Sequence, residues 1–480
     1  MFVPGGEQSK FLTVLPADPD TGVAPRLYSH PRQRPEPDAL VQLADAAALP
    51  GVRGVVGMPD IHVGYGVPIG CVMAADGIVC PAAVGYDINC GMRLLAAPPE
   101  LRSADIDAPA LAKAIARRVP LGEGKDNFKL DAKKFKRLIA GGVPALDEIE
   151  IPGLADAVSH ADRFGGETER IEDGGKLAAD PDFCSEFALD RGRTQIGTLG
   201  GGNHFIEIQY VEIVYDGNLA DAWGLREGGL CVMIHSGSRG LGHQVGDDYM
   251  ALGRVLAAKD GRKSVGRELP YFRLDEPEAR EYISAMNAAA NFAFINRQVI
   301  ALLVREALWE IYPGVRLRFV YDFAHNIAKF EGHGCERLLI HRKGAARAFT
   351  AARMKDGVFA ATGQPVLVPG SMGTASYVMA GCDEGGAAYA SVNHGAGRRL
   401  SRAAARGKSR SGRTAREEAV TDAEFAAAMR GIHLIAADMR FAKEEAPQAY
   451  KDIDLVTEAV VGAGLAEKVA RLKPLAVLKG

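Results

Sequence analysis

The stretch GTLGGGNHFIEIQ, residues 197–209, combines a glycine-rich turn with the beginning of a strand. The three glycines Gly200, Gly201 and Gly202 allow the backbone to approach a ligand closely. His204 and Glu207 then enter a short apolar run that is typical of a strand. The stretch therefore predicts a strand that starts at a candidate binding loop. A glycine turn in front of an ordinary strand is an equally good interpretation.

Strand and helix patterns alternate on both sides of this stretch. The apolar runs at residues 230–234 and 316–321 predict buried strands, each followed by a loop that contains a histidine. Helices are expected at residues 36–49 and 276–312 and over much of residues 455–472, and Thr421 and Glu424 have the spacing of a capping box. The patterns by themselves therefore indicate mixed α and β structure.

The composition is that of a soluble globular protein. The chain has 480 residues, 47% hydrophobic and 24% charged, with a net charge of -3. This length suits one large domain or two to four ordinary ones, and the charge means that any nucleic-acid site must be local. We expect no membrane span and no signal peptide. The seven cysteines include no CxxC pair, which favours reduced thiols in the cytoplasm over a disulfide framework or a structural zinc site.

Several common nucleotide and hydrolase motifs are absent. Gly407-Lys408-Ser409 ends like a P-loop, but Arg402 stands where the first glycine of that motif is required. The chain contains no HExxH, GxSxG, GxGxxG or Lys-x-Asp-Gly sequence. A nucleotide bound covalently here would therefore need a nucleophile other than the lysine of ATP-type ligases.

Asp87 and Cys90 lie three positions apart in GYDINCG, residues 85–91. A tight turn between the glycines could aim both side chains at one point, where a carboxylate and a thiolate make a good divalent-metal pair. An Asx-type turn with a buried free cysteine is the more common use of such a pattern.

Three further histidines occur in unusual local contexts. His235 and His325 each follow an apolar run, and His394 precedes Gly-Ala-Gly. Loops at the ends of buried strands often carry ligands, and a neutral imidazole, with an ordinary pKa of about 6.5, is a competent nucleophile. Buried core or turn histidines remain the alternative for each. Together with His204, Asp87 and Cys90, the first two offer five ligands, enough for two ions.

The most basic stretch of the chain lies directly after this last histidine. Between residues 398 and 416 the basic residues are Arg398, Arg399, Arg402, Arg406, Lys408, Arg410, Arg413 and Arg416, with no acidic residue among them. Such a run is usually a solvated face. Its position favours contact with phosphates more than its composition alone would.

Long motifs spread over the chain resemble those of the RtcB RNA ligase family. They are MPDIHVGYGVPIG (58–70), VGYDINCGMRL (84–94), GTLGGGNHFIEIQ (197–209), HSGSRGLGHQV (235–245), DFAHNIAK (322–329), HRKGAARAF (341–349), PGSMGTASYV (369–378), NHGAGR (393–398) and EEAPQAYKDI (444–453). The resemblance runs from about residue 50 to the end. It implies one compact α+β catalytic domain over residues 1–480, with mixed sheets and surrounding helices.

The resemblance also implies a site, residue by residue. Cys90 would bridge two Mn²⁺ ions, with His204 and His235 completing one ion and Asp87 and His325 the other. His394 would be the nucleophile toward GTP. Arg239 would hold an RNA phosphate. The residues implied for GTP or GMP are Asn203, His204, Phe205, Ile206, Glu207, His325, Asn326, Pro369, Gly370, Ser371, Met372, Ser376, His394, Gly395, Ala396, Gly397 and Lys479.

The implied reaction joins an RNA 3′-phosphate or 2′,3′-cyclic phosphate to a 5′-hydroxyl through a histidine–GMP intermediate and an RNA-ppG end. Its RNA partner would be tRNA halves or cleaved RNA, and an archease-like activator is a further partner to consider. Thiolate and imidazole also suit zinc, so manganese rests on the resemblance. Two alternatives stay open at this point, a metal-dependent cyclic phosphoesterase without ligation and a non-enzymatic RNA-binding factor.

Overall fold

The glycine turn at residues 200–202 leads into a central strand of the protein, in a computed structural model that describes residues 10–159, 167–262, 269–405 and 420–480. Gly200 and Gly202 have φ values of 99° and 68°, which L side chains rarely adopt. The strand that follows, β7 (Phe205–Val214), lies in an eight-stranded sheet. The strand predicted after the glycines is therefore confirmed.

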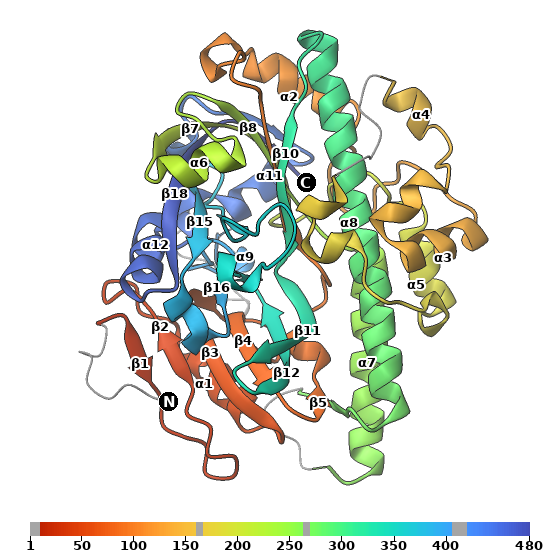
Figure 1. The fold of residues 1–480 in the computed structure, drawn as a ribbon, viewed down its shortest axis with the longest axis vertical. Helices are drawn as coiled ribbons and strands as arrows, with labels where there is room; N and C mark the ends of the chain where they lie inside the picture. The colour runs from red at the N-terminus through yellow and green to blue at the C-terminus, as the bar shows by residue number, and fades with distance from the viewer. Residues whose placement is uncertain (1–9, 160–166, 263–268, 406–419) are drawn as a thin grey trace.

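Two large sheets carry most of the strands (Figure 1). The eight-stranded sheet has the order β10 (Arg318–Ala324), β6 (Gly91–Ala96), β8 (Leu230–Ser236), β7, β18 (Ala466–Lys479), β15 (Ser376–Gly381) and β14 (Pro365–Val368), with β17 (His433–Ala436) parallel to β18. The six-stranded sheet has the order β1 (Leu12–Val14), β2 (Arg26–Tyr28), β3 (Val52–His62), β4 (Ile69–Ala75), β12 (Glu336–Lys343) and β11 (Asn326–His333). Two small pairs are β13 (Ala345–Arg347) with β16 (Ser391–Asn393), and β5 (Ile78–Val79) with β9 (Phe272–Arg273).

Helices cover the sheets from outside, as Figure 1 shows for the long pair α7 and α8. The helices are α1 (Pro37–Ala47), α2 (Ala108–Ala116), α3 (Ala132–Gly141), α4 (Leu154–Ala157), α5 (Glu186–Gly192), α6 (Gly217–Trp223), α7 (Arg239–Lys259), α8 (Pro277–Ile311), α9 (Arg402–Ala405), α10 (Asp422–Ala428), α11 (Met439–Ala442) and α12 (Ile453–Gly462). With mixed sheets and separate helices, the fold class is α+β, as predicted. Within the part of the chain that the structure describes, no helix has the length and apolar character to cross a membrane.

The two faces of the eight-stranded sheet contribute to two different hydrophobic clusters. One, the helix-side cluster, lies between this sheet and the helices, and the other lies between this sheet and the six-stranded sheet. On β6, Leu95 packs toward the helices, while Leu94 on the opposite face packs against the six-stranded sheet. This alternation follows from the two-residue period of a strand. Helix α8 is buried over most of its surface because it lies in the helix-side cluster. The sheet that carries the functional loops is thus covered on both faces.

Most sequence predictions of elements are confirmed, and one is wrong. Helices α1 and α8 and strands β8 and β10 lie where expected, and Thr421 and Glu424 form the capping box of α10. The helix expected over residues 455–472 ends at Gly462, and a 14-residue strand begins at Ala466. Gly464 between them has a φ of 67°, which ends the helix, and the buried strand β18 then carries the chain to its terminus. The expectation of one domain over residues 1–480 stays a prediction.

Candidate active site

Asp87 and Cys90 are held by the tight turn that their spacing suggested. The Cys90 N–H donates a hydrogen bond to the Asp87 carbonyl at 2.9 Å, and Asn89 between them has a φ of 50°. The next residue, Gly91, starts strand β6. The turn therefore places a carboxylate and a thiol at the end of a central strand.

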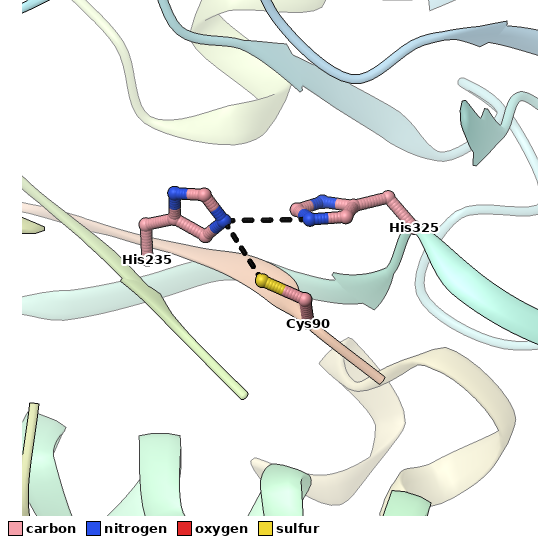
Figure 2. A group of neighbouring side chains, drawn as sticks. All are labelled: Cys90, His235 and His325. Atoms are coloured by element: carbon pink, nitrogen blue, oxygen red, sulfur yellow. Dashed lines mark hydrogen bonds between the residues drawn. The ribbon is translucent and has the colours of Figure 1, made fainter. Parts of the chain in front are cut away.

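The five candidate metal ligands meet at this turn. Cys90 Sγ lies 3.3 Å from His204 Nε2 and 3.1 Å from His235 Nε2. His235 Nε2 lies 3.3 Å from His325 Nε2, and Figure 2 shows these two rings and Cys90 converging. Asp87 Oδ2 lies 2.8 Å from His204 Nε2. Side chains from residues 87 to 325 thus form one compact cluster of nitrogen, sulfur and oxygen atoms.

The cluster divides into two groups that share Cys90. One group is Asp87, Cys90 and His204, and the other is Cys90, His235 and His325. The expectation from the sequence paired His204 with His235, and Asp87 with His325. The geometry differs because His235 and His325 come from β8 and the end of β10, the two strands that flank β6. His204 instead directly precedes β7, which pairs with β8 on the side away from β6, and its ring lies next to the Asp87 carboxylate.

The donor atoms of the first group suit a cation. His204 Nδ1 lies 3.0 Å from the Leu199 carbonyl and donates to it, which leaves the lone pair of Nε2 facing the Asp87 carboxylate. Burial lowers the pKa of His204, so the ring is neutral at neutral pH. Burial alone would raise the pKa of Asp87, and it is a positive charge at the position of His204 that holds that pKa below its usual range. A cation between the two groups would turn the repulsion of facing lone pairs into coordination.

The donor atoms of the second group, Cys90, His235 and His325, also suit a cation. Burial holds the pKa values of His235 and His325 well below the usual range, so both rings are neutral ligands. Burial also raises the pKa of the Cys90 thiol well above its usual value. A thiol in this position loses its proton readily only beside a cation. The residues present therefore fit two metal ions that share a thiolate.

Arg297 on α8 fixes the backbone on both sides of the cluster. It donates hydrogen bonds of 2.9 Å to the carbonyls of Asn89 and Ser236, which precede and follow two of the candidate ligands. It also forms a buried ion pair with Asp322, with Nη2 and Oδ1 2.7 Å apart. The arginine and the aspartate are fully buried, so their charges depend on each other.

We predict that Arg297→Met lowers the free energy of unfolding by about 3–5 kcal/mol, because it leaves Asp322 with fewer partners in a dry interior. Denaturant unfolding measures the change. The matched control is Arg117→Met, which removes an exposed ion pair with Glu310 and should cost less than about 1 kcal/mol. Equal losses in the two variants would rule out a special role for the buried pair.

His394 lies at the end of β16 and is held by Asp60. The His394 Nδ1 is 2.7 Å from Asp60 Oδ2, and the backbone N–H of His394 donates to the same oxygen at 3.3 Å. Asp60 on β3 is fully buried, and the His394 ring centroid lies 4.9 Å from that of His325. With Nδ1 donating to a carboxylate, Nε2 is left as the nitrogen with a free lone pair. This arrangement suits a nucleophile.

The loop after His394 requires glycine. Gly397 has a φ of 74°, and a Cβ there would lie 2.0 Å from the Asp60 carbonyl oxygen. Asp60 was not among the site residues predicted from the sequence, although it lies in the motif at residues 58–70. A carboxylate inside the apolar run of a predicted strand was the signal that could have identified it.

One cavity of about 850 Å³ joins the metal cluster to His394. Most of the residues implied for GTP or GMP line it, but Ile206 and Ser376 do not. Ile206 is buried in the helix-side cluster, and Ser376 Oγ accepts a hydrogen bond of 3.1 Å from Gln209. The lining residues from the implied GTP set are Asn203, His204, Phe205, Glu207, His325, Asn326, Pro369, Gly370, Ser371, Met372, His394, Gly395, Ala396, Gly397 and Lys479.

Lys479 reaches the cavity from a central strand and is not part of a frayed tail. It is 4% exposed, and its Nζ donates to the carbonyls of Gly202 at 3.0 Å and His204 at 3.2 Å. Burial lowers the pKa of Lys479 to about 8. Burial raises the pKa of Glu207, also in the cavity, to about 8. The two side chains provide a donor and an acceptor for a polar ligand ring.

The basic stretch contributes to the cavity only in part. Arg402 lines the cavity, and its Nε lies 3.2 Å from Glu445, which also pairs with Arg398 at 3.1 Å. Arg239, at the start of α7, also lines the cavity and donates to Thr198 at 3.4 Å. Arg399 is exposed and donates to the Gln448 carbonyl at 3.0 Å. The other basic residues of the stretch lie outside the described residues, namely Arg406, Lys408, Arg410, Arg413 and Arg416.

Fold and site together define a protein in which two groups of candidate metal ligands share Cys90 and lie in one cavity with His394, a histidine held by the Asp60 carboxylate. A family model described as "tRNA-splicing ligase RtcB" matches residues 42–480, and the chain belongs to this RtcB family. It is 42% identical over 458 residues to the tRNA-splicing ligase RtcB of Thermococcus kodakarensis, covering 92% of this chain and 91% of that protein. It is 41% identical over 453 residues to the RNA-splicing ligase RtcB of Mycobacterium tuberculosis, covering 92% and 100%. It is 38% identical over 462 residues to RNA-splicing ligase RtcB homolog 1 of Entamoeba dispar, covering 92% and 82%.

Proposed function

We propose that this protein is a GTP-dependent RNA ligase that joins RNA 3′-phosphate or 2′,3′-cyclic phosphate ends to 5′-hydroxyl ends. The observation that carries the proposal is the juxtaposition of His394, held by Asp60 at 2.7 Å, with the cluster around Cys90 in one cavity. The names of the relatives, which are RNA-splicing and tRNA-splicing ligases, support the same reaction class.

In this proposal Asp87, Cys90 and His204 would hold one Mn²⁺ ion, and Cys90, His235 and His325 would hold a second. Bound there, the ions would neutralise the charge that develops on phosphate oxygens. The choice of manganese over zinc rests on the family, since the same donor atoms suit both metals. Lys479 and Glu207 would bind the guanine, and Arg239 an RNA phosphate.

His394 Nε2 would attack the α-phosphorus of GTP, so that a P–N bond forms, a P–O bond breaks and pyrophosphate leaves. Asp60 keeps the proton on Nδ1 and stabilises the cationic ring as that bond forms. An oxygen of the RNA 3′-phosphate then displaces the histidine from phosphorus and gives the RNA-ppG end. A 5′-hydroxyl attacks the RNA phosphorus of that end, loses its proton and expels GMP. A 2′,3′-cyclic phosphate would first be opened by water.

The test uses the purified full-length protein with Mn²⁺, α-labelled GTP and two RNA strands bearing a 3′-phosphate and a 5′-hydroxyl. We expect an acid-labile label on the protein and a joined RNA that appears only when GTP is present. A metal-loaded protein that opens a cyclic phosphate without GTP and never takes up label would contradict the proposal. That result would identify the protein as a phosphoesterase without ligase activity.

We predict that Asp60→Asn slows covalent labelling by GTP by about 10²- to 10⁴-fold, because the amide neither fixes the tautomer nor stabilises a cationic ring. Single-turnover labelling measures the rate, and metal content should stay unchanged. Asp76→Asn is the matched control, since Asp76 pairs with Arg53 at the surface. A rate for Asp60→Asn within twofold of that control would contradict the positioning role.

A further inference from the structure

Three aromatic rings form a ladder along one wall of the cavity. The ring centroids of Tyr65 and Tyr86 lie 5.3 Å apart with an interplanar angle of 55°, and those of Tyr86 and His243 lie 6.3 Å apart with an interplanar angle of 18°. All three residues line the cavity. The Tyr65 side is open to solvent, since this residue is 38% exposed, and His243 is also exposed. Nothing in the proposed ligation chemistry uses these rings.

The scaffold holds the ladder in place. Tyr86 packs on α7 at Gly246, where a Cβ would lie 3.4 Å from the tyrosine ring. The Tyr65 hydroxyl accepts a hydrogen bond of 3.1 Å from Arg254, and its carbonyl accepts one from the buried Lys343. An exposed aromatic ring that is held in position loses little entropy when a flat ligand stacks on it.

The ladder lies next to the candidate chemistry but apart from the candidate guanine site. Tyr86 directly precedes Asp87, so the ladder borders the metal cluster. Glu207 and Lys479, in contrast, lie on β7 and β18, and neither strand carries a ladder residue. The aromatic residues and the candidate guanine site therefore come from different elements of the cavity wall.

We propose that Tyr65, Tyr86 and His243 form a stacking site for an unpaired RNA base next to the junction being sealed. The inference rests on the proposed ligase function. Single-stranded RNA ends are recognised largely by stacking of bases on aromatic side chains, and such stacking tolerates every base. Arg239 and Arg191, which line the same cavity, carry the positive charge that the adjoining phosphates require.

The experiment combines protein variants that lack one aromatic ring with RNA strands that lack the terminal base. The affinity of metal-loaded full-length protein is measured by fluorescence anisotropy for RNA strands with a terminal 3′-phosphate or 5′-hydroxyl, each with a normal or an abasic end nucleotide. We expect Tyr65→Leu to weaken binding of at least one normal strand about tenfold and to leave binding of its abasic counterpart unchanged. Tyr65→Phe keeps the ring, loses the hydrogen bond from Arg254, and should bind like the parent protein. His243→Leu provides a second variant at the other end of the ladder.

The matched control is Tyr215→Leu, because Tyr215 is an exposed tyrosine that does not line the cavity. If the parent protein labels with GTP and joins RNA, but Tyr65→Leu and His243→Leu bind RNA like the control, the stacking site is wrong and the ligase function stands. A raised KM for GTP with unchanged RNA affinity would assign the rings to guanine and also overturn the inference. A parent protein that neither labels nor joins RNA would refute the proposed function, whatever the RNA affinities show.

Discussion

His394→Ala is expected to abolish covalent labelling of the protein by GTP and to reduce RNA joining by at least about 10⁴-fold, the scale on which loss of a catalytic nucleophile acts. The reason is geometric, because the buried carboxylate of Asp60 lies 2.7 Å from His394 Nδ1 and leaves Nε2 as the nucleophilic atom. His325 is the nearest other ring, but burial in the metal cluster commits its Nε2 to that cluster. No other histidine of the cavity is paired with a carboxylate in this way among the described residues, except His204 in the cluster itself.

The readout is the label that remains on the denatured protein, together with metal content by elemental analysis. The metals should remain, since His394 belongs to neither group of ligands. His333→Ala is the matched control, because His333 lies on β11 and does not line the cavity. Label retained by His394→Ala at the level of this control would sink the assignment of the nucleophile.

An RNA substrate that is already activated separates the steps of the reaction further. If His394 acts only in taking up GTP, His394→Ala should still join RNA that already carries the ppG end, because the proposed final step would depend on the residues around Cys90 and on the RNA contacts, but not on His394. Sealing of this activated RNA at a rate near that of the parent protein would confirm that the remaining machinery is intact. Loss of this step as well would mean that His394 also positions the junction.

Local patterns predicted much of the fold because they are read over short distances. The apolar runs before His235 and His325 and the long helical pattern of α8 lie where expected. The last strand was missed because residues 466–479 are apolar enough for a helix, and their β structure depends on pairing with β7 and β15. Such long-range pairing overrides local propensity and leaves no local signal.

In the candidate site, too, local sequence predicted the individual residues, but not the features that depend on long-range contacts. The residues with unusual local contexts do meet in one cavity, but their grouping around Cys90 followed from strand order, which the sequence did not reveal. Asp60 was missed because its importance arises only from its distance to His394, 334 positions away in the chain. The roles assigned to all these residues stay predictions until they are measured.

Cys90→Ala is expected to lose both metal ions and, with them, every step from labelling to sealing. Cys90 is the one residue that both groups of ligands share. Its loss leaves one group with a carboxylate and an imidazole, and the other group with two imidazoles. Even outer partners of metal ligands change affinity about 10- to 100-fold, so the loss of a bridging ligand should exceed about 100-fold. Elemental analysis after dialysis gives the metal content, and labelling by GTP gives the activity. Cys231→Ala is the matched control, because Cys231 is equally buried on β8 but belongs to neither group. Two metal ions retained by Cys90→Ala would disprove the shared thiolate, whereas metal lost by both variants would mean that removing any buried cysteine disturbs the fold.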